Sequence, residues 1–150
     1  MYYIDLNNTT KYNDILSYIL KTCDEVSFHF PILCEERYNT PYLLEDYKKY
    51  QKAKAKLLSE LFNHQAKKRT SNIYQNIKLG YTTQIINVKL YPDLIEMIKN
   101  NHLYNWVWWN ALPEDPCFFS NNECRFITIS HEETFYVCDN TKDSSLIKLI

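Results

Sequence analysis

A single glycine, Gly80, stands among the 150 residues, and this scarcity limits the folds and active sites that the chain can build. An average composition of about 7% glycine would give roughly ten. The phosphate-binding P-loop, the dinucleotide-binding Gly-x-Gly-x-x-Gly turn and the Gly-x-Ser-x-Gly nucleophile turn each need more than one glycine. The sequence therefore disfavours most nucleotide-binding enzymes and α/β-hydrolases. Asparagine, present fifteen times, is expected to supply turn residues in the left-handed region instead.

Length and composition indicate one globular domain. Hydrophobic residues make up 45% of the chain and charged residues 23%, which are ordinary values for a folded protein. Charged residues interrupt the first 25 positions, and no apolar run approaches the ~20 residues that a membrane-spanning helix needs. The five cysteines are an odd number without a Cys-x-x-Cys pair, as is typical of reduced thiols. These features predict a cytoplasmic protein that does not associate with a membrane.

Hydrophobic periodicity predicts an α+β fold, with a mainly antiparallel sheet, one long helix and two shorter helices packed on it. Predicted helices cover 11–23, 41–68 and 92–99, and predicted strands cover 2–6, 25–30, 73–91, 106–109, 117–120, 123–130 and 134–138. Thr40 and Pro41 favour the start of the long helix, and Lys67–Arg69 would complement its C-terminal dipole. Asn121-Asn122 predicts a hairpin turn within a β-meander over 104–138.

All three tryptophans lie in one segment, 105–119, immediately before an acidic Pro-Glu-Asp-Pro turn. In a strand, Trp106 and Trp108 would point to one face and Trp109 to the other. Either the segment is a central strand with indoles in the core, or one indole is exposed as a binding anchor, a role in which tryptophan is enriched. In the second interpretation Glu114 and Asp115 would form the rim of a binding surface.

The stretch Lys48–Arg69 holds eight basic residues against one acid, Glu60. If this basic helix binds nucleic acid, the phosphate-contacting residues would be Lys48, Lys49, Lys52, Lys56, Lys67, Lys68 and Arg69. The other interpretation is a solvated helix face whose lysine stems cover the core. The preference for lysine over arginine disfavours base recognition.

No catalytic or metal-binding constellation is recognisable. Ser130-His-Glu-Glu133 lacks the second histidine of a His-Glu-x-x-His zinc site, because position 135 is phenylalanine. The four histidines show no paired ligand spacing, so no metal and no cofactor are expected. His131 could activate Cys117, Cys124 or Cys138 as a thiol nucleophile, but these cysteines fit a buried hydrophobic role equally well.

A pattern over residues 104–139 resembles one found in small uncharacterised proteins of low-GC Gram-positive bacteria. It consists of Pro113-Glu-Asp-x-x-Phe-Phe119, a short hairpin, the aromatic strand Arg125-Phe-Ile, and Ser130-His-Glu132. Some of these proteins look like immunity proteins encoded beside polymorphic toxins. The resemblance implies an immunity-like role but assigns no catalytic residue.

These observations together favour a non-enzymatic module that binds another protein, an inhibitor or immunity protein of a toxin or enzyme. Residues 93–150 hold nine acids against four bases, and exposed acids could steer the protein onto a cationic cleft. The predicted partner-binding residues are Trp106, Trp108, Trp109, Glu114, Asp115, His131, Glu132 and Glu133. A nucleic-acid-associated protein that uses the basic helix 48–69 and a small enzyme with a Cys/His site remain as alternatives. The sequence leaves the partner and the oligomeric state open.

Overall fold

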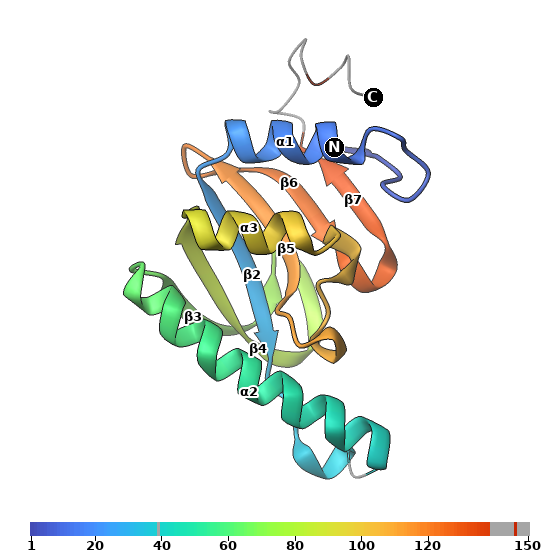
Figure 1. Cartoon of the computed structure of the whole chain (residues 1–150), viewed down its shortest axis with the longest axis vertical. Helices are drawn as coiled ribbons and strands as arrows, with labels where there is room; N and C mark the ends of the chain where they lie inside the picture. Colours follow the sequence, from blue (N-terminus) through green and yellow to red (C-terminus); the bar gives the residue numbers. More distant parts are fainter. Residues whose placement is uncertain (39, 139–145, 147–150) are drawn as a thin grey trace.

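The computed structural model describes residues 1–38, 40–138 and 146, and within them the chain forms one seven-stranded antiparallel sheet (Figure 1). The strand order across the sheet is β1-β7-β6-β5-β2-β4-β3. The strands are β1 (Tyr2–Tyr3), β2 (Glu25–Pro31), β3 (Lys67–Tyr74), β4 (Ile77–Lys89), β5 (Glu114–Ser120), β6 (Glu123–Ile129) and β7 (Thr134–Val137). The α+β prediction is confirmed.

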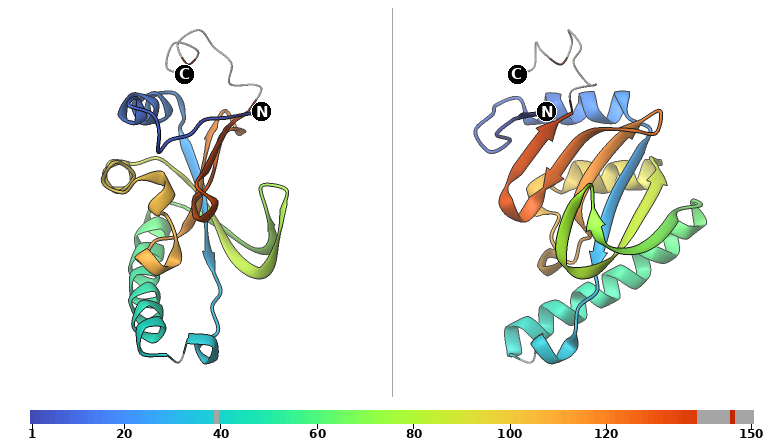
Figure 2. Two further views of the ribbon diagram at one scale, coloured as in Figure 1. Left: turned by 90° about the vertical axis from the view of Figure 1, so that its right-hand side faces the viewer. Right: turned by 180° about the vertical axis from the view of Figure 1, so that it is seen from behind.

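Three α-helices lie on one face of the sheet, and the β3–β4 hairpin bends away on the opposite side (Figure 2). They are α1 (Tyr12–Thr22), α2 (Pro41–Asn63) and α3 (Pro92–Asn100). Short 3₁₀ turns connect other elements, namely η1 (Glu35–Tyr38), η2 (Leu103–Asn105), η3 (Trp108–Asn110) and η4 (Ser130–Glu132). No helix in the described part of the chain is long and apolar enough to cross a lipid bilayer.

The core forms between the helices and one face of the sheet because side chains alternate along each strand. In β2, Val26, Phe28 and Phe30 are buried in the helix-side core. The intervening Ser27 and His29 are also fully buried, although they point to the opposite face. The β3–β4 hairpin bends on that face (Figure 2), and there Tyr74 of β3 packs against the His29 ring and its hydroxyl donates to the Ser27 carbonyl.

Two-residue turns close both long hairpins, and their residues have positive φ. Gln75 and Asn76 have φ of 50° and 64°, and Asn121 and Asn122 have φ of 52° and 64°. This combination is that of a type I′ turn, whose twist matches that of the flanking strands. The predicted hairpin at Asn121-Asn122 is confirmed, and asparagine replaces glycine there as expected. Gly80, by contrast, lies within β4 and has no positive φ.

The predicted long helix ends five residues early. The amide of Ala66 donates to the Leu61 carbonyl and the amide of Gln65 donates to the Phe62 carbonyl, which is the Schellman pattern. Gln65 occupies the left-handed position that usually belongs to glycine, with φ of 60°. The prediction that Lys67–Arg69 complete the helix is therefore wrong, because these residues open β3.

The prediction of a strand over 106–109 is also wrong. The segment folds as two consecutive 3₁₀ turns, η2 and η3, separated by Trp106 and Val107. Ala111, with φ of 58°, ends the second turn in the left-handed region. The tryptophans consequently do not alternate across a sheet. Trp106 is fully buried, Trp108 is half-buried and Trp109 is 49% exposed.

Candidate functional site

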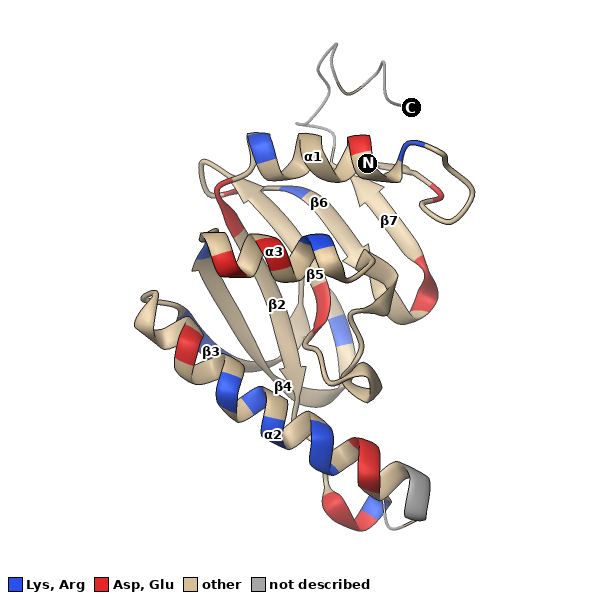
Figure 3. Cartoon of the chain, in the orientation of Figure 1, with Lys and Arg blue, Asp and Glu red and all other residues tan. Residues whose placement is uncertain are grey.

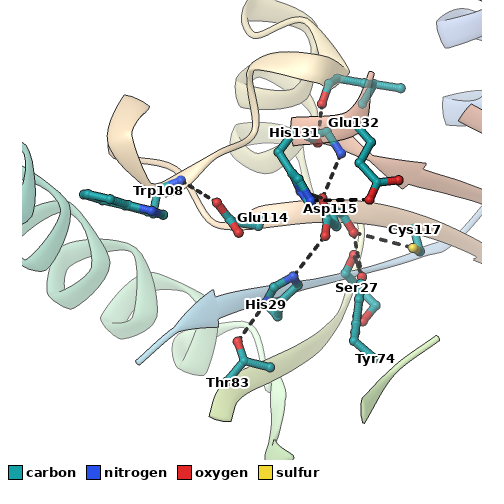
Figure 4. Close-up of polar contacts among 12 residues, drawn as sticks. Ser27, His29, Tyr74, Thr83, Trp108, Glu114, Asp115, Cys117, His131 and Glu132 are labelled. Carbon is teal, nitrogen blue, oxygen red and sulfur yellow. Dashed lines mark hydrogen bonds and ion pairs between the residues drawn. The ribbon is translucent and has the colours of Figure 1, made fainter. Parts of the chain in front are cut away.

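A β-bulge at the start of β5 positions two adjacent carboxyl groups. Ser27 pairs with Cys117 and His29 with Glu114, so one intervening residue of β2 lies opposite two of β5, Asp115 and Pro116. Asp115 takes up the extra residue with φ of 57°, a conformation that aspartate tolerates better than most residues. The bulge directs the Glu114 carboxyl towards Trp108 and the Asp115 carboxyl between His29 and His131 (Figure 4).

The Asp115 carboxylate connects three elements of the fold. Its Oδ2 lies 3.2 Å from His29 Nε2, and its Oδ1 accepts a hydrogen bond of 2.8 Å from the Ser130 amide. The other ring nitrogen of His29 lies 2.7 Å from Thr83 Oγ1. His131 is more distant, with Nδ1 at 4.0 Å from Asp115 Oδ1. His29 and Thr83 are completely buried, so this chain of polar groups runs from Asp115 into the interior of the protein.

The backbone of the bulge is fixed as well. The Tyr74 hydroxyl lies 2.7 Å from the Asp115 carbonyl oxygen and 3.0 Å from the Ser27 carbonyl oxygen. Tyr74 comes from the end of β3, so the curled hairpin holds the bulge from the side opposite the helices. Burial raises the pKa of this hydroxyl well above its usual value, which keeps it a hydrogen-bond donor. These contacts of Tyr74 hold the backbone next to Glu114 and thereby fix the position of Glu114.

Glu114 is a buried carboxyl group beside open space. Only 5% of the residue is exposed, and its Oε2 accepts a hydrogen bond of 2.9 Å from the Trp108 amide. Burial raises its pKa above the usual 4.5, the Trp108 amide opposes this shift, and neighbouring Asp115 adds to it. A charge at this position is therefore unfavourable for folding, and such sites are candidates for function.

We expect Glu114→Gln to raise the thermal midpoint at neutral pH by roughly 2–4 °C. The pKa of Glu114 is higher in the folded than in the unfolded chain, so stability falls as pH rises through the interval between the two values. Glutamine removes this cost and keeps an oxygen for the Trp108 amide. Calorimetry at neutral and acidic pH would show a gain that disappears in acid. A neutral-pH midpoint below that of the wild type would contradict the prediction.

A pocket of about 540 Å³ opens above Glu114 at the end of the sheet. Its walls come from the end of β2 and the following loop, η1, β4, η3 and η4. The lining residues are Pro31, Ile32, Leu33, Cys34, Arg37, Tyr38, Gly80, Tyr81, Thr82, Trp108, Trp109, Glu114 and His131. Three of them, Ile32, Tyr81 and Trp109, are large hydrophobic residues that the fold leaves exposed. The pocket thus combines an apolar rim with one buried acid.

The aromatic rings of the pocket are held by edge-to-face contacts. Trp108 meets Tyr38 at a centroid distance of 5.0 Å and an interplanar angle of 71°, and meets Trp109 at 5.9 Å and 86°. Tyr50 of α2 also packs edge-on against Trp108. Edge-to-face pairs are favourable arrangements of aromatic rings. Trp108 therefore connects the rings of Tyr38 and Trp109 to α2.

The structure divides the predicted partner-binding residues into separate groups. Trp108, Trp109, Glu114 and His131 line the same pocket, whereas Trp106 is fully buried in the core. The prediction of exposed acids at 114 and 115 is wrong, because the bulge buries both carboxyl groups. The acids of η4 and its C-cap, Glu132 and Glu133, are exposed as predicted. The Glu133 carboxylate accepts a hydrogen bond from the Asn7 side chain.

The basic residues do not form one helix face. Lys48, Lys49, Lys52 and Lys56 are exposed on α2, whereas Lys67, Lys68 and Arg69 lie on β3 (Figure 3). Glu45 neutralises Lys49 through an ion pair of 3.1 Å. Lys54 lies over the Phe30 ring, and burial lowers its pKa. Lysine stems thus cover apolar surface at this position, as the structural interpretation of the helix predicts.

The structure does not support Cys117 as the predicted nucleophile. Cys117 is fully buried, and burial raises its pKa to about 12, which disfavours a thiolate at neutral pH. Cys124 lies in β6 and Cys138 directly follows β7, and a hydrogen bond with Cys124, not a histidine, lowers the pKa of Cys138 to about 7. The described residues contain no group of three or more potential ligands that could hold a metal ion.

Sequence reasoning missed most of the pocket. Cys34, Arg37 and Tyr38 lie in a segment to which no helix or strand was assigned, and Tyr81 lies in a predicted strand without a predicted role. The pairing of His29 with Asp115 spans 86 residues and carries no local signal. The one available signal was the sequence pattern that contains Glu114-Asp115 and Ser130-His131. In the structure its two parts are joined by the hydrogen bond from the Ser130 amide to Asp115.

Comparison of the chain with known protein families, with curated proteins and with solved structures gave no match.

Proposed function

We propose that this protein binds another protein and that the pocket above Glu114 receives a side chain of that partner. The observation that carries the proposal is the convergence of Ile32, Tyr81 and Trp109 on one concave surface. These three residues lie far apart in the sequence, and each leaves more than a third of its surface in solvent. Exposed apolar residues that gather around a pocket are typical of interaction sites, whereas isolated ones are common on any surface.

The chemistry of the pocket supports binding rather than catalysis. Within the described residues its acid, Glu114, forms no hydrogen bond to a side chain, and the one hydrogen bond that it accepts comes from the Trp108 backbone amide. Binding energy at protein interfaces concentrates in a few aromatic residues near the centre of a desolvated pocket. Trp109 is the candidate for such a residue, because its ring packs against Trp108 and its exposed half could be covered by a partner.

Removal of the Trp109 indole is expected to weaken partner binding by about 2 kcal/mol or more, which corresponds to roughly 30-fold. The measurement is a pull-down from native lysate with tagged wild type, Trp109→Ala and Tyr3→Ala, in the presence of nuclease, followed by mass spectrometry. Tyr3 is 50% exposed and lies outside the pocket, so its variant is a matched control.

A protein retained by the wild type and Tyr3→Ala but lost by Trp109→Ala would support the proposal. Equal recovery by all three variants would contradict it. Recovery of nucleic acid alone without nuclease, lost as salt rises, would favour the alternative that uses the lysines of α2 and β3.

The finer proposal is that the partner is a toxin or enzyme that this protein inhibits. It is supported by the acidic excess of the C-terminal part of the chain and by the immunity-like sequence pattern. The experiment is to add the purified protein to the partner identified above and to measure the partner's activity. Inhibition by the wild type but not by Trp109→Ala is expected, and unchanged activity at saturating concentration would exclude an inhibitor.

A further inference from the structure

Within the described residues, the buried Glu114 carboxyl group of the pocket forms no ion pair. Arg37 of η1 and His131 of η4 both line the pocket. Within the described residues, neither forms an ion pair with Glu114, and His131 instead lies 3.7 Å from Glu132. A buried carboxylate without a cationic partner is costly, since its desolvation is not compensated. A ligand that supplies the missing positive charge would remove this cost.

The walls around this charge are suited to a cation. Tyr38, Tyr81, Trp108 and Trp109 place four aromatic rings on the pocket, and the Tyr38–Trp108 and Trp108–Trp109 pairs are close to perpendicular. The negative faces of aromatic rings attract ammonium and guanidinium groups, tryptophan most strongly.

The Glu114 carboxyl group is placed to bind the charged end of such a side chain. Glu114 is the only acid on the pocket wall within the described chain, and its Trp108 hydrogen bond fixes its orientation. Burial raises the pKa of the Tyr81 hydroxyl, and the charge of Glu114 adds to this shift. Glu114 and the four aromatic rings line the same pocket.

We propose that the pocket binds a positively charged side chain of the partner, lysine or arginine, with Glu114 as counter-ion and the aromatic rings as walls. This inference rests on the proposed function and specifies the chemistry of the group that enters. Arg37, which is exposed and lines the same pocket, weakens the attraction of Glu114 for a cation.

The test uses the three tryptophan indole N–H signals of the ¹⁵N-labelled full chain in a two-dimensional NMR titration. The probes are N-acetyl-arginine amide and N-acetyl-lysine amide, with the isosteric but uncharged N-acetyl-citrulline amide as control. We expect the signals of Trp108 and Trp109 to shift with a dissociation constant on the order of 1–10 mM for a charged probe. The Trp106 signal should remain fixed, because its indole donates to the Asn101 carbonyl inside the protein.

Three variants test whether the result depends on the charge. Glu114→Gln keeps the acceptor for the Trp108 amide and should weaken the charged probe about tenfold. Glu96→Gln removes an exposed negative charge on α3, outside the pocket, and should leave the affinity unchanged. Arg37→Ala should strengthen the charged probe about twofold, because it removes a repelling charge.

Equal shifts with citrulline, unchanged affinity in Glu114→Gln, or no shift at about 50 mM probe would each overturn the inference. These outcomes are distinct from a failure of the proposed function, which depends on the loss of the partner in Trp109→Ala. A pocket that rejects cations while Trp109→Ala still loses the partner would retain the binding function and replace the charged group by an apolar one.

Discussion

Replacement of Asp115 by alanine is expected to destabilise the protein by about 3–5 kcal/mol, the range measured when one partner of a buried polar pair is removed. The substitution leaves the buried ring of His29 without its partner on Nε2 and the Ser130 amide without its acceptor. Alanine also tolerates the left-handed backbone of this position less well than aspartate does. The free energy of unfolding, measured by urea denaturation, tests the expectation.

Asp115→Asn provides the matched control. Asparagine accepts the left-handed conformation, keeps an oxygen for the Ser130 amide and offers an amide donor to His29. Its cost is expected to be about 1 kcal/mol, the net value of one hydrogen bond. If alanine and asparagine destabilise the protein equally, the negative charge itself holds the cluster together. If neither does, the His29–Asp115 contact does not support the bulge.

The parts of the fold with strong local signals were predictable from the sequence. Helices α1 and α3 have clear apolar stripes, and α3 begins with Pro92 as expected. The hairpin at Asn121-Asn122 was recognisable because its turn type requires residues that tolerate positive φ. The end of α2 was not recognisable, because Gln65 takes the position at which a glycine would have marked the stop.

The tryptophan segment was misjudged because its pattern fits two structures. Aromatic residues in succession favour a strand by propensity, but tertiary contacts override propensity. Here Trp106 fills the core against Phe28, Trp108 packs against Tyr50, and the chain turns between them. The burial of Glu114 and Asp115 depends on a β-bulge, which requires the register of two strands that lie far apart in the sequence.

The candidate site was predictable only in part. The aromatic and acidic types of residue were identified, since Trp108, Trp109, Glu114 and His131 do converge. Their arrangement is different from that expected, with acid at the base and rings on the wall instead of acids on a rim. The loop after β2 completes the pocket by a contact across the sheet that no local pattern encodes.

The three tryptophans are expected to separate into one that stabilises the fold and one that serves binding. Trp106→Ala should cost about 3–5 kcal/mol, as for other large residues truncated in a core. Its ring is fully buried, lies 5.7 Å from the Phe28 ring and donates a hydrogen bond to the Asn101 carbonyl. Trp109→Ala should change stability by no more than about 0.5 kcal/mol, since half of its surface is in solvent.

Urea denaturation followed by circular dichroism measures both variants without relying on tryptophan fluorescence. Trp106→Phe should recover more than half of the loss, because it refills most of the cavity and gives up only the indole hydrogen bond. The decisive comparison is between the stability of each variant and its affinity for the partner. A Trp109→Ala chain that is as stable as the wild type but has lost its partner shows that the indole is kept for recognition. An equally large loss of stability in Trp106→Ala and Trp109→Ala would make both tryptophans part of the core and remove Trp109 as a binding anchor.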